Sequence, residues 1–137
     1  MREITLQTAG RTDFVDLTGE VQSVVTEQGM AAGAVVVFNP HTTAAVTINE
    51  GADPDVVRDM TFALDRLVPW RDGYHHGEGN AAAHIKASMF GSSVTVIVSD
   101  GKLVLGTWQK IWFCDFDGPR RRRIWIRTLA AAAGQSG

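Results

Sequence analysis

The alternation of apolar and polar residues along the first third of the chain predicts β-strands. In REITLQT (2–8), the isoleucine and leucine alternate with polar neighbours, which is typical of a strand with one buried face. The segment DFVDL (13–17) is a candidate partner for that strand. AGAVVVFN (32–39) is a continuous β-branched run and predicts a strand buried on both faces. TTAAVTIN (42–49) predicts a further strand directly after it.

Two segments with helical spacing predict short helices. TGEVQSVVTEQG (18–29) places valines at helical intervals, with Thr18 as a candidate N-cap and Gly29 as a candidate terminator. AAAHIKASMFG (81–91) predicts a second short helix, which ends at Gly91.

DPDVVRDMTFALDRLVP (53–69) is the segment with the clearest helix signals. Asp53 can cap the first turn, and Pro54 suits the first helical position. The stretch from Trp70 to Asn80 that follows predicts a loop. The apolar stripe of the helix comprises Val56, Val57, Met60, Leu64 and Leu67.

The last third of the chain returns to β-strand patterns. SSVTVIVS (92–99) and KLVL (102–105) flank Asp100-Gly101, which is a strong hairpin signal. The complete pattern therefore predicts an α+β fold with antiparallel strands and two or three helices. Two longer strands, TWQKIWFCDF (107–116) and RRRIWIRTL (121–129), are separated by the turn DGPR (117–120).

Composition narrows the class of protein. The chain has 137 residues, 45% of them hydrophobic and 20% charged, with a net charge of -2, which fits one soluble globular domain over 1–137 with a flexible tail at 130–137. The near-neutral charge gives no reason to expect a specific nucleic-acid partner. No apolar run is long enough to predict a membrane span, and the N-terminus lacks the apolar core of a secretory signal.

The single cysteine, Cys114, has no partner for a disulfide within the chain. Together with the missing secretory signal, this favours a reducing cytoplasm. Cys114 alternates with large apolar residues, so a buried, inert thiol is favoured over a nucleophile.

Histidines are the main candidates for chemistry. The small-residue stretch GYHHGEGNAAAHIK (73–86) contains His75, His76 and His84, and the fourth histidine, His41, lies between two predicted strands. Three neutral imidazoles from separate elements can form an open zinc site. Adjacent residues of an extended loop point opposite ways, so only one of His75 and His76 is expected to join. The alternative for His41 is a hydrogen-bonded turn residue.

Acidic residues and arginines add candidates. Glu50, at the end of a predicted strand, is a general base, a carboxylate that orients a histidine, or a plain surface charge. Asp53 is equally a helix cap. Four consecutive arginines, Arg120 to Arg123, predict either a solvated sheet edge or a phosphate-binding face. The hydroxyls of Thr42 and Thr43 lie beside His41.

These blocks resemble the YjbQ family, also called the secondary thiamine-phosphate synthase family. The resemblance covers nearly the whole chain. It implies a compact antiparallel β-sandwich with short helices, assembled as a homotrimer. The blocks that carry it are HTTAAVTINEGADPDV (41–56), YHHGEGNAAAHIKASMFGSSV (74–94), DGKLVLGTWQKIW (100–112) and DGPRRRR (117–123).

The resemblance also implies roles for individual residues. His41, His76 and His84 match the family's metal-binding histidines. The expected metal is zinc, with magnesium as the alternative, because imidazole ligands suit zinc better. The further residues implied are Glu50 and Asp53 as acidic pocket residues and Gln109 beside the same site. To these we add Arg120 and Arg121 of the DGPR block, and the hydroxyls of Thr42 and Thr43, as candidate substrate or phosphate contacts.

The activity implied by the family is the coupling of a pyrimidine pyrophosphate to a thiazole phosphate, which gives thiamine phosphate and pyrophosphate. Such a reaction needs cations that stabilise the leaving pyrophosphate and no protein nucleophile. Two alternatives use the same residues. One is a metal-dependent hydrolase of a small phosphorylated substrate, with Glu50 as base. The other is a non-catalytic trimer that binds a metal or an anion.

Overall fold

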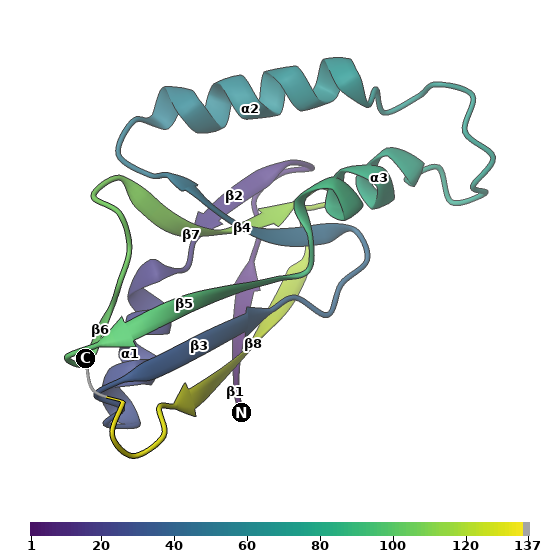
Figure 1. Cartoon of the computed structure of the whole chain (residues 1–137). Coiled ribbons are helices and arrows are strands. Elements are labelled where there is room, and N and C mark those ends of the chain that lie inside the picture. Colours follow the sequence, from purple (N-terminus) through teal and green to yellow (C-terminus); the bar gives the residue numbers. More distant parts are fainter. Residues whose placement is uncertain (136–137) are drawn as a thin grey trace.

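The computed structural model describes residues 1–135, which form two antiparallel sheets and three helices (Figure 1). The α+β class predicted from the sequence is confirmed. The strands are β1 (Arg2–Gln7), β2 (Asp13–Asp16), β3 (Gly33–Phe38), β4 (Ala44–Glu50), β5 (Ser93–Ser99), β6 (Lys102–Leu103), β7 (Gln109–Asp115) and β8 (Arg121–Ala130), and the helices are α1 (Thr18–Glu27), α2 (Pro54–Leu67) and α3 (Ala81–Phe90).

The strands divide into a five-stranded sheet A, in the order β1-β8-β3-β5-β6, and a three-stranded sheet B, in the order β2-β7-β4. β5 and β6 form the predicted hairpin, whose turn residues Asp100 and Gly101 both have positive φ. This is the conformation that a two-residue hairpin turn requires. The main core lies between the two sheets and includes the inner face of α1. Its buried residues are Leu17, Val21, Val24, Val25, Met30, Val35, Val37, Ala44, Val46, Val96, Val98, Ile111, Phe113, Ile124 and Ile126.

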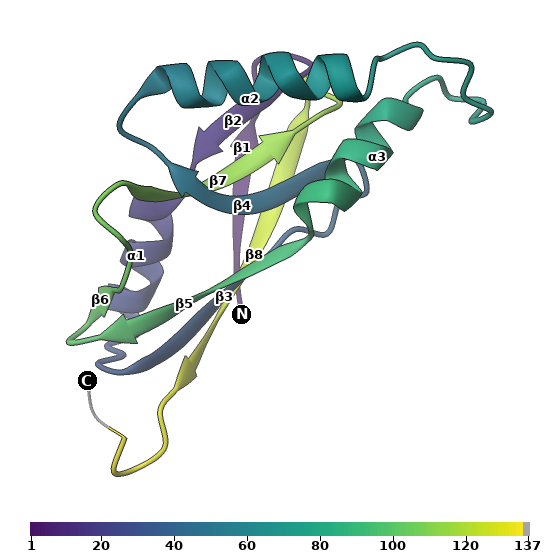
Figure 2. The same ribbon diagram turned by 45° about the horizontal axis from the view of Figure 1, so that its top comes forward.

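The outer faces of the two sheets differ in what covers them. α2 and α3 lie over sheet B (Figures 1 and 2), where Leu64 and Ala83 join Cys114 and Phe116 in a second buried cluster. Sheet A keeps apolar side chains such as Phe38 and Ile97, 41% and 64% exposed, on its outer face. Sheet B is therefore the covered sheet.

Several predicted details of the strands are wrong. β2 pairs with β7 rather than with β1, because Phe14 packs edge-on against Phe90, Trp112 and Phe116 on the sheet B side. β3 is not buried on both faces: Val35 and Val37 are buried, whereas Phe38 is exposed. The predicted sheet edge is partly right for the arginine run: residues 121–123 pair with β1 on one side, but the pairing of β8 with β3 stops at Trp125, and Arg122 is buried rather than solvated.

The helix ends are partly as predicted. Asp53 caps α2 through its Oδ1, which accepts from the Asp55 N–H at 2.9 Å, and α3 ends before Gly91. Thr18 does not cap α1: its hydroxyl accepts from the N–H of Ile111 instead, and Leu17 occupies the N-cap position. Leu67 of the predicted apolar stripe is exposed.

Strand β8 extends to the first residue of the predicted tail. β8 reaches Ala130, which pairs with Gly33, and the N–H of Ala131 donates to Ala32. Of the predicted flexible tail, residues 136 and 137 lie outside the described part. Within residues 1–135, no helix is long and apolar enough to cross a membrane.

Candidate functional site

His41 lies beside β8 at the point where the pairing of β8 with β3 ends. β3 pairs with β8 only as far as Phe38, opposite Trp125. Beyond that point the N–H of Arg123 donates to Nε2 of His41 at 3.0 Å. Buried Asn39 holds the turn, because its side chain accepts from the N–H of His41 and donates to the His41 and Ala44 carbonyls. The imidazole is thus fixed by the backbone of β8.

A pocket of about 370 Å³ opens beside His41 on the outer face of β1 and β8. Residues i and i+2 of a strand share a face, so Arg121 and Arg123 both point toward it. Within residues 1–135, neither of these two guanidinium groups forms an ion pair. The pocket is therefore rich in positive charge. Its lining residues are Glu3, Thr5, His41, Arg121, Arg122 and Arg123.

A buried ion pair lies beneath this pocket and joins the two sheets. Arg122 of β8 and Asp115 of β7 are 4% and 0% exposed. The guanidinium donates to both oxygens of the carboxylate, at 2.9 and 2.6 Å, and also to the hydroxyl of Thr43 at 2.9 Å. The hydroxyl of Thr8 donates to the same carboxylate at 2.7 Å. Both carboxylate oxygens and the Nε and Nη2 of the guanidinium are therefore hydrogen-bonded, which offsets the cost of burying the two charges.

The surroundings of His41 favour its neutral form. Burial, followed by the nearby guanidinium of Arg122, lowers the pKa of His41 below its ordinary value. Cys114, in contrast, is fully buried, and its burial raises the pKa of the thiol well above the ordinary range. The predicted burial of Cys114 is confirmed.

His76 and His84 form a separate pair on the opposite side of sheet B from sheet A. Their ring centroids are 5.2 Å apart at an interplanar angle of 87°. Nε2 of His76 lies 3.8 Å from a carboxylate oxygen of Glu78. His75 is exposed and takes no part in the ring contact between His76 and His84. In the part of the chain that the structure describes, no three His, Cys, Asp or Glu side chains form a group that could hold a metal ion.

The predicted acidic residues lie at the other end of β4 from His41. β4 is seven residues long, so its ends are separated by roughly 20 Å. Glu50 accepts from the backbone N–H groups of Ala52 and Asp53, and Asp53 caps α2. Gln109, opposite Glu50 in the β4–β7 register, accepts from the N–H of Gly106 at 2.7 Å. Each side chain thus has a local structural partner.

The predicted phosphate contacts are divided among different surroundings. Arg121 lines the pocket, whereas Arg120 is bound to Asp117 at 3.1 Å. Thr42 is exposed, and Thr43 is buried against Arg122. Sequence reasoning did not single out Thr5 and included Arg123 only as a member of the arginine run, although alternation along a strand puts Arg123 on the same face as Arg121.

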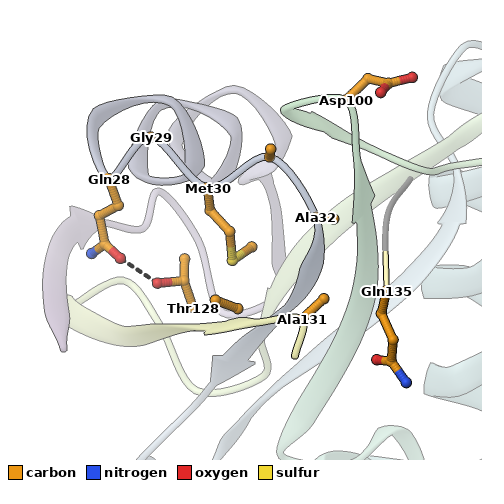
Figure 3. Close-up of a pocket in the computed structure, with 10 residues that line it drawn as sticks. Gln28, Gly29, Met30, Ala32, Asp100, Thr128, Ala131 and Gln135 are labelled. Atoms are coloured by element: carbon orange, nitrogen blue, oxygen red, sulfur yellow. Dashed lines mark hydrogen bonds between the residues drawn. The ribbon is translucent and has the colours of Figure 1, made fainter. Parts of the chain in front are cut away.

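A further pocket of about 560 Å³ lies where the end of α1 meets the ends of β3 and β8 (Figure 3). Its side chains include Met30 and Asp100, and the Thr128 hydroxyl donates to the side chain of Gln28. Among residues 1–135, those that line this pocket include no histidine, arginine or cysteine. This pocket therefore lacks the chemistry found around His41.

Comparison with known proteins identifies the family. The profile described as "UPF0047 protein YjbQ-like" matches residues 2–131. The chain belongs to the YjbQ/UPF0047 family. Among its relatives, UPF0047 protein YugU of Bacillus subtilis is 46% identical over 94% of this chain and 98% of its own length. A UPF0047 protein of Archaeoglobus fulgidus is 45% identical over 93% of this chain and 99% of its own length.

Solved structures of YjbQ/UPF0047 proteins share the whole fold. A conserved YjbQ/UPF0047 protein from Clostridium acetobutylicum superposes with a TM-score of 0.93 at 50% identity, covering 94% of this chain and all (100%) of that one. A protein of unknown function from Sulfolobus solfataricus gives a TM-score of 0.91 at 32% identity, with coverages of 95% and 96%. The arrangement of two antiparallel sheets and three helices is therefore that of the YjbQ family.

Proposed function

We propose that this YjbQ-family chain binds a small phosphorylated molecule in the pocket beside His41. The observation that carries the proposal is the pair of unpaired guanidinium groups, Arg121 and Arg123, on one wall of a cavity of about 370 Å³. Arginine presents a planar fork of donors that matches phosphate oxygens. The hydroxyl of Thr5 adds a neutral donor on the neighbouring strand.

The reaction that fits this pocket and the family resemblance is transfer of a pyrimidine group from its pyrophosphate ester to a thiazole phosphate. The carbon–oxygen bond breaks with its electron pair on the leaving pyrophosphate, and the thiazole nitrogen forms the new carbon–nitrogen bond. Arg121 and Arg123 would stabilise the charge that develops on the leaving group. No side chain of the pocket needs to act as a nucleophile.

The test combines binding and turnover. Arg121→Ala with Arg123→Ala should weaken pyrophosphate binding by about 10-fold or more per arginine, because each charged hydrogen bond contributes about 1.5–3 kcal/mol. Arg127→Ala is the matched control, since Arg127 is exposed on the same strand and does not line the pocket. Calorimetry measures binding, and chromatography of thiamine phosphate measures turnover. Equal affinity of the double variant and the control would refute the site.

Binding of a metal ion is a second part of the proposal, and only His76 and His84 of the three predicted ligands fit it. His76 and His84 are close enough to share an ion, and Glu78 adds a carboxylate nearby. His41 does not fit, because its Nε2 already accepts a hydrogen bond and arginines surround it. If zinc binds, we propose that His76 and His84 hold it and that further ligands come from elsewhere. Zinc content of untagged protein and of the His76→Ala variant tests this.

Assembly as a homotrimer is proposed through the outer face of sheet A. This face carries exposed apolar side chains together with the stacked rings of Phe38 and Trp125, 6.0 Å apart. Aromatic residues of this kind are enriched in protein interfaces. Sedimentation velocity should give three times the chain mass for the wild type and a monomer for Phe38→Glu. A wild-type monomer at micromolar concentration would exclude the assembly.

A further inference from the structure

We infer that His41 is a neutral hydrogen-bond donor to a phosphate-class anion, acting through Nδ1, and that it is not a metal ligand. The inference concerns the pocket of the proposed function and rests on that proposal for the class of anion. It assigns to this imidazole a role different from the metal-binding role that the family resemblance implies.

The backbone of β8 decides which ring nitrogen carries the proton. Past Trp125, β8 has no β3 residue to pair with, and the N–H of Arg123 donates to Nε2 of His41 at 3.0 Å. A neutral imidazole has one acceptor and one donor nitrogen. Because Nε2 is the acceptor, the proton is on Nδ1. Within residues 1–135, Nδ1 has no hydrogen-bond partner of its own.

The same geometry excludes His41 from a metal site. A metal ligand needs an unshared nitrogen lone pair, and in this arrangement one lone pair accepts the Arg123 N–H while the other nitrogen is protonated. Arg121 and Arg123, neither of which forms an ion pair within residues 1–135, line the pocket with His41 and make the position unfavourable for a divalent cation. His76 and His84 face each other elsewhere.

An anion, in contrast, finds complementary groups in this pocket. His41, Thr5, Arg121 and Arg123, which carry an imidazole N–H, a hydroxyl and two guanidinium groups, all line it. The carboxylate of Glu3 also lines it and repels an anion from the β1 side. The anion is therefore expected near β8 and His41, where a neutral donor adds selectivity without adding charge.

Two conservative variants separate the roles of the two nitrogens. The amide nitrogen of asparagine can replace Nδ1 as a donor, whereas the longer glutamine can place an oxygen near Nε2 to accept from Arg123. We expect His41→Asn to keep phosphate affinity within about 3-fold and to lower the Tm by a few degrees. We expect His41→Gln to lose about 10-fold or more in affinity and to keep the Tm. The opposite order, or equal losses of affinity in both variants, would overturn the inference.

Nuclear magnetic resonance tests the protonation pattern directly. Long-range proton–nitrogen correlation spectra of the full chain should show His41 with its proton on Nδ1, and zinc chloride should broaden the signals of His76 and His84 but not those of His41. His75→Asn is the control that leaves the other three histidines in place. A proton on Nε2, or broadening of His41 by zinc, overturns the inference while phosphate binding by the wild type can still stand. Failure of the wild type to bind inorganic phosphate or pyrophosphate overturns the proposed function, and the anion role of His41 with it.

Discussion

The two ends of β4 use polar residues in opposite ways. At the first end, buried Thr43 accepts from Arg122, which is paired with Asp115, and buried Asn39 forms hydrogen bonds with the backbone of His41 and Ala44. At the far end, Glu50 satisfies backbone N–H groups of the turn that leads into α2. One end connects the two sheets to each other, and the other end only completes local turns.

Unpaired positive charge remains available for a ligand at the His41 end of β4. A buried charge must be paired, so Arg122 is committed to Asp115. The arginines on either side of it point to the opposite face and keep their donors free. At the Glu50 end of β4, the side chains of Glu50 and Gln109 already accept hydrogen bonds from nearby backbone N–H groups. Binding chemistry is therefore expected at the His41 end of β4.

The largest effect is expected from breaking the buried pair. Asp115→Ala leaves the Arg122 charge buried and unpaired, which should lower the free energy of unfolding by about 3–5 kcal/mol. Urea denaturation followed by tryptophan fluorescence measures the change. Asp59→Ala, at an exposed position of α2, is the control and should change stability by less than about 0.5 kcal/mol. Similar stabilities of the two variants would show that the network does not hold the sheets together.

A smaller loss is expected when the turn at the His41 end loses its amide. Asn39→Ala removes three hydrogen bonds of a buried side chain and leaves the Ala44 carbonyl without its partner, at a cost of about 1–3 kcal/mol. Asn49→Ala makes the same substitution at an exposed position near the other end of β4. In thermal unfolding, the Tm of Asn39→Ala should be well below the Tm of Asn49→Ala. The reverse order would contradict the difference between the two ends.

Next comes the helix cap at the far end. Asp53→Ala should cost about 1 kcal/mol, because the first turn of α2 loses the acceptor for the Asp55 N–H. Asp53→Asn keeps an acceptor oxygen and should retain most of the stability. If both variants lose the same amount, the charge of Asp53 rather than its hydrogen bond is what matters, and a role beyond capping regains support.

Local patterns predicted the elements well and their pairing less well. The Asp53 cap, the Asp100-Gly101 hairpin and the end of α3 at Gly91 each depend on a few neighbouring residues. The partner of β2 depends instead on aromatic residues from β7 and α3, which no local pattern reveals.

At the candidate site, too, local patterns predicted the elements but not the contacts between them. Alternation along a strand puts Arg121 and Arg123 on one face and Arg122 on the other, but it does not show which face is buried. Arg122 is buried only because Asp115, from the other sheet, lies opposite it. The hydrogen bond between His41 and Arg123 depends on where β3 stops pairing with β8. Both are properties of the assembled sheets.

The smallest effect is expected for Glu50, and it tests the comparison most directly. Glu50→Gln keeps an oxygen for the turn, so the free energy of unfolding should change by less than about 0.5 kcal/mol. Pyrophosphate affinity should stay within about 2-fold of the wild type, because β4 separates Glu50 from the pocket by roughly 20 Å within one chain. Calorimetry compares the pyrophosphate affinity of Glu50→Gln with that of the arginine double variant under the same conditions. The predicted catalytic role of Glu50 would instead gain support from lost turnover with unchanged stability. Because the length of β4 keeps Glu50 away from its own pocket, that result would require Glu50 of one copy to reach the pocket of another.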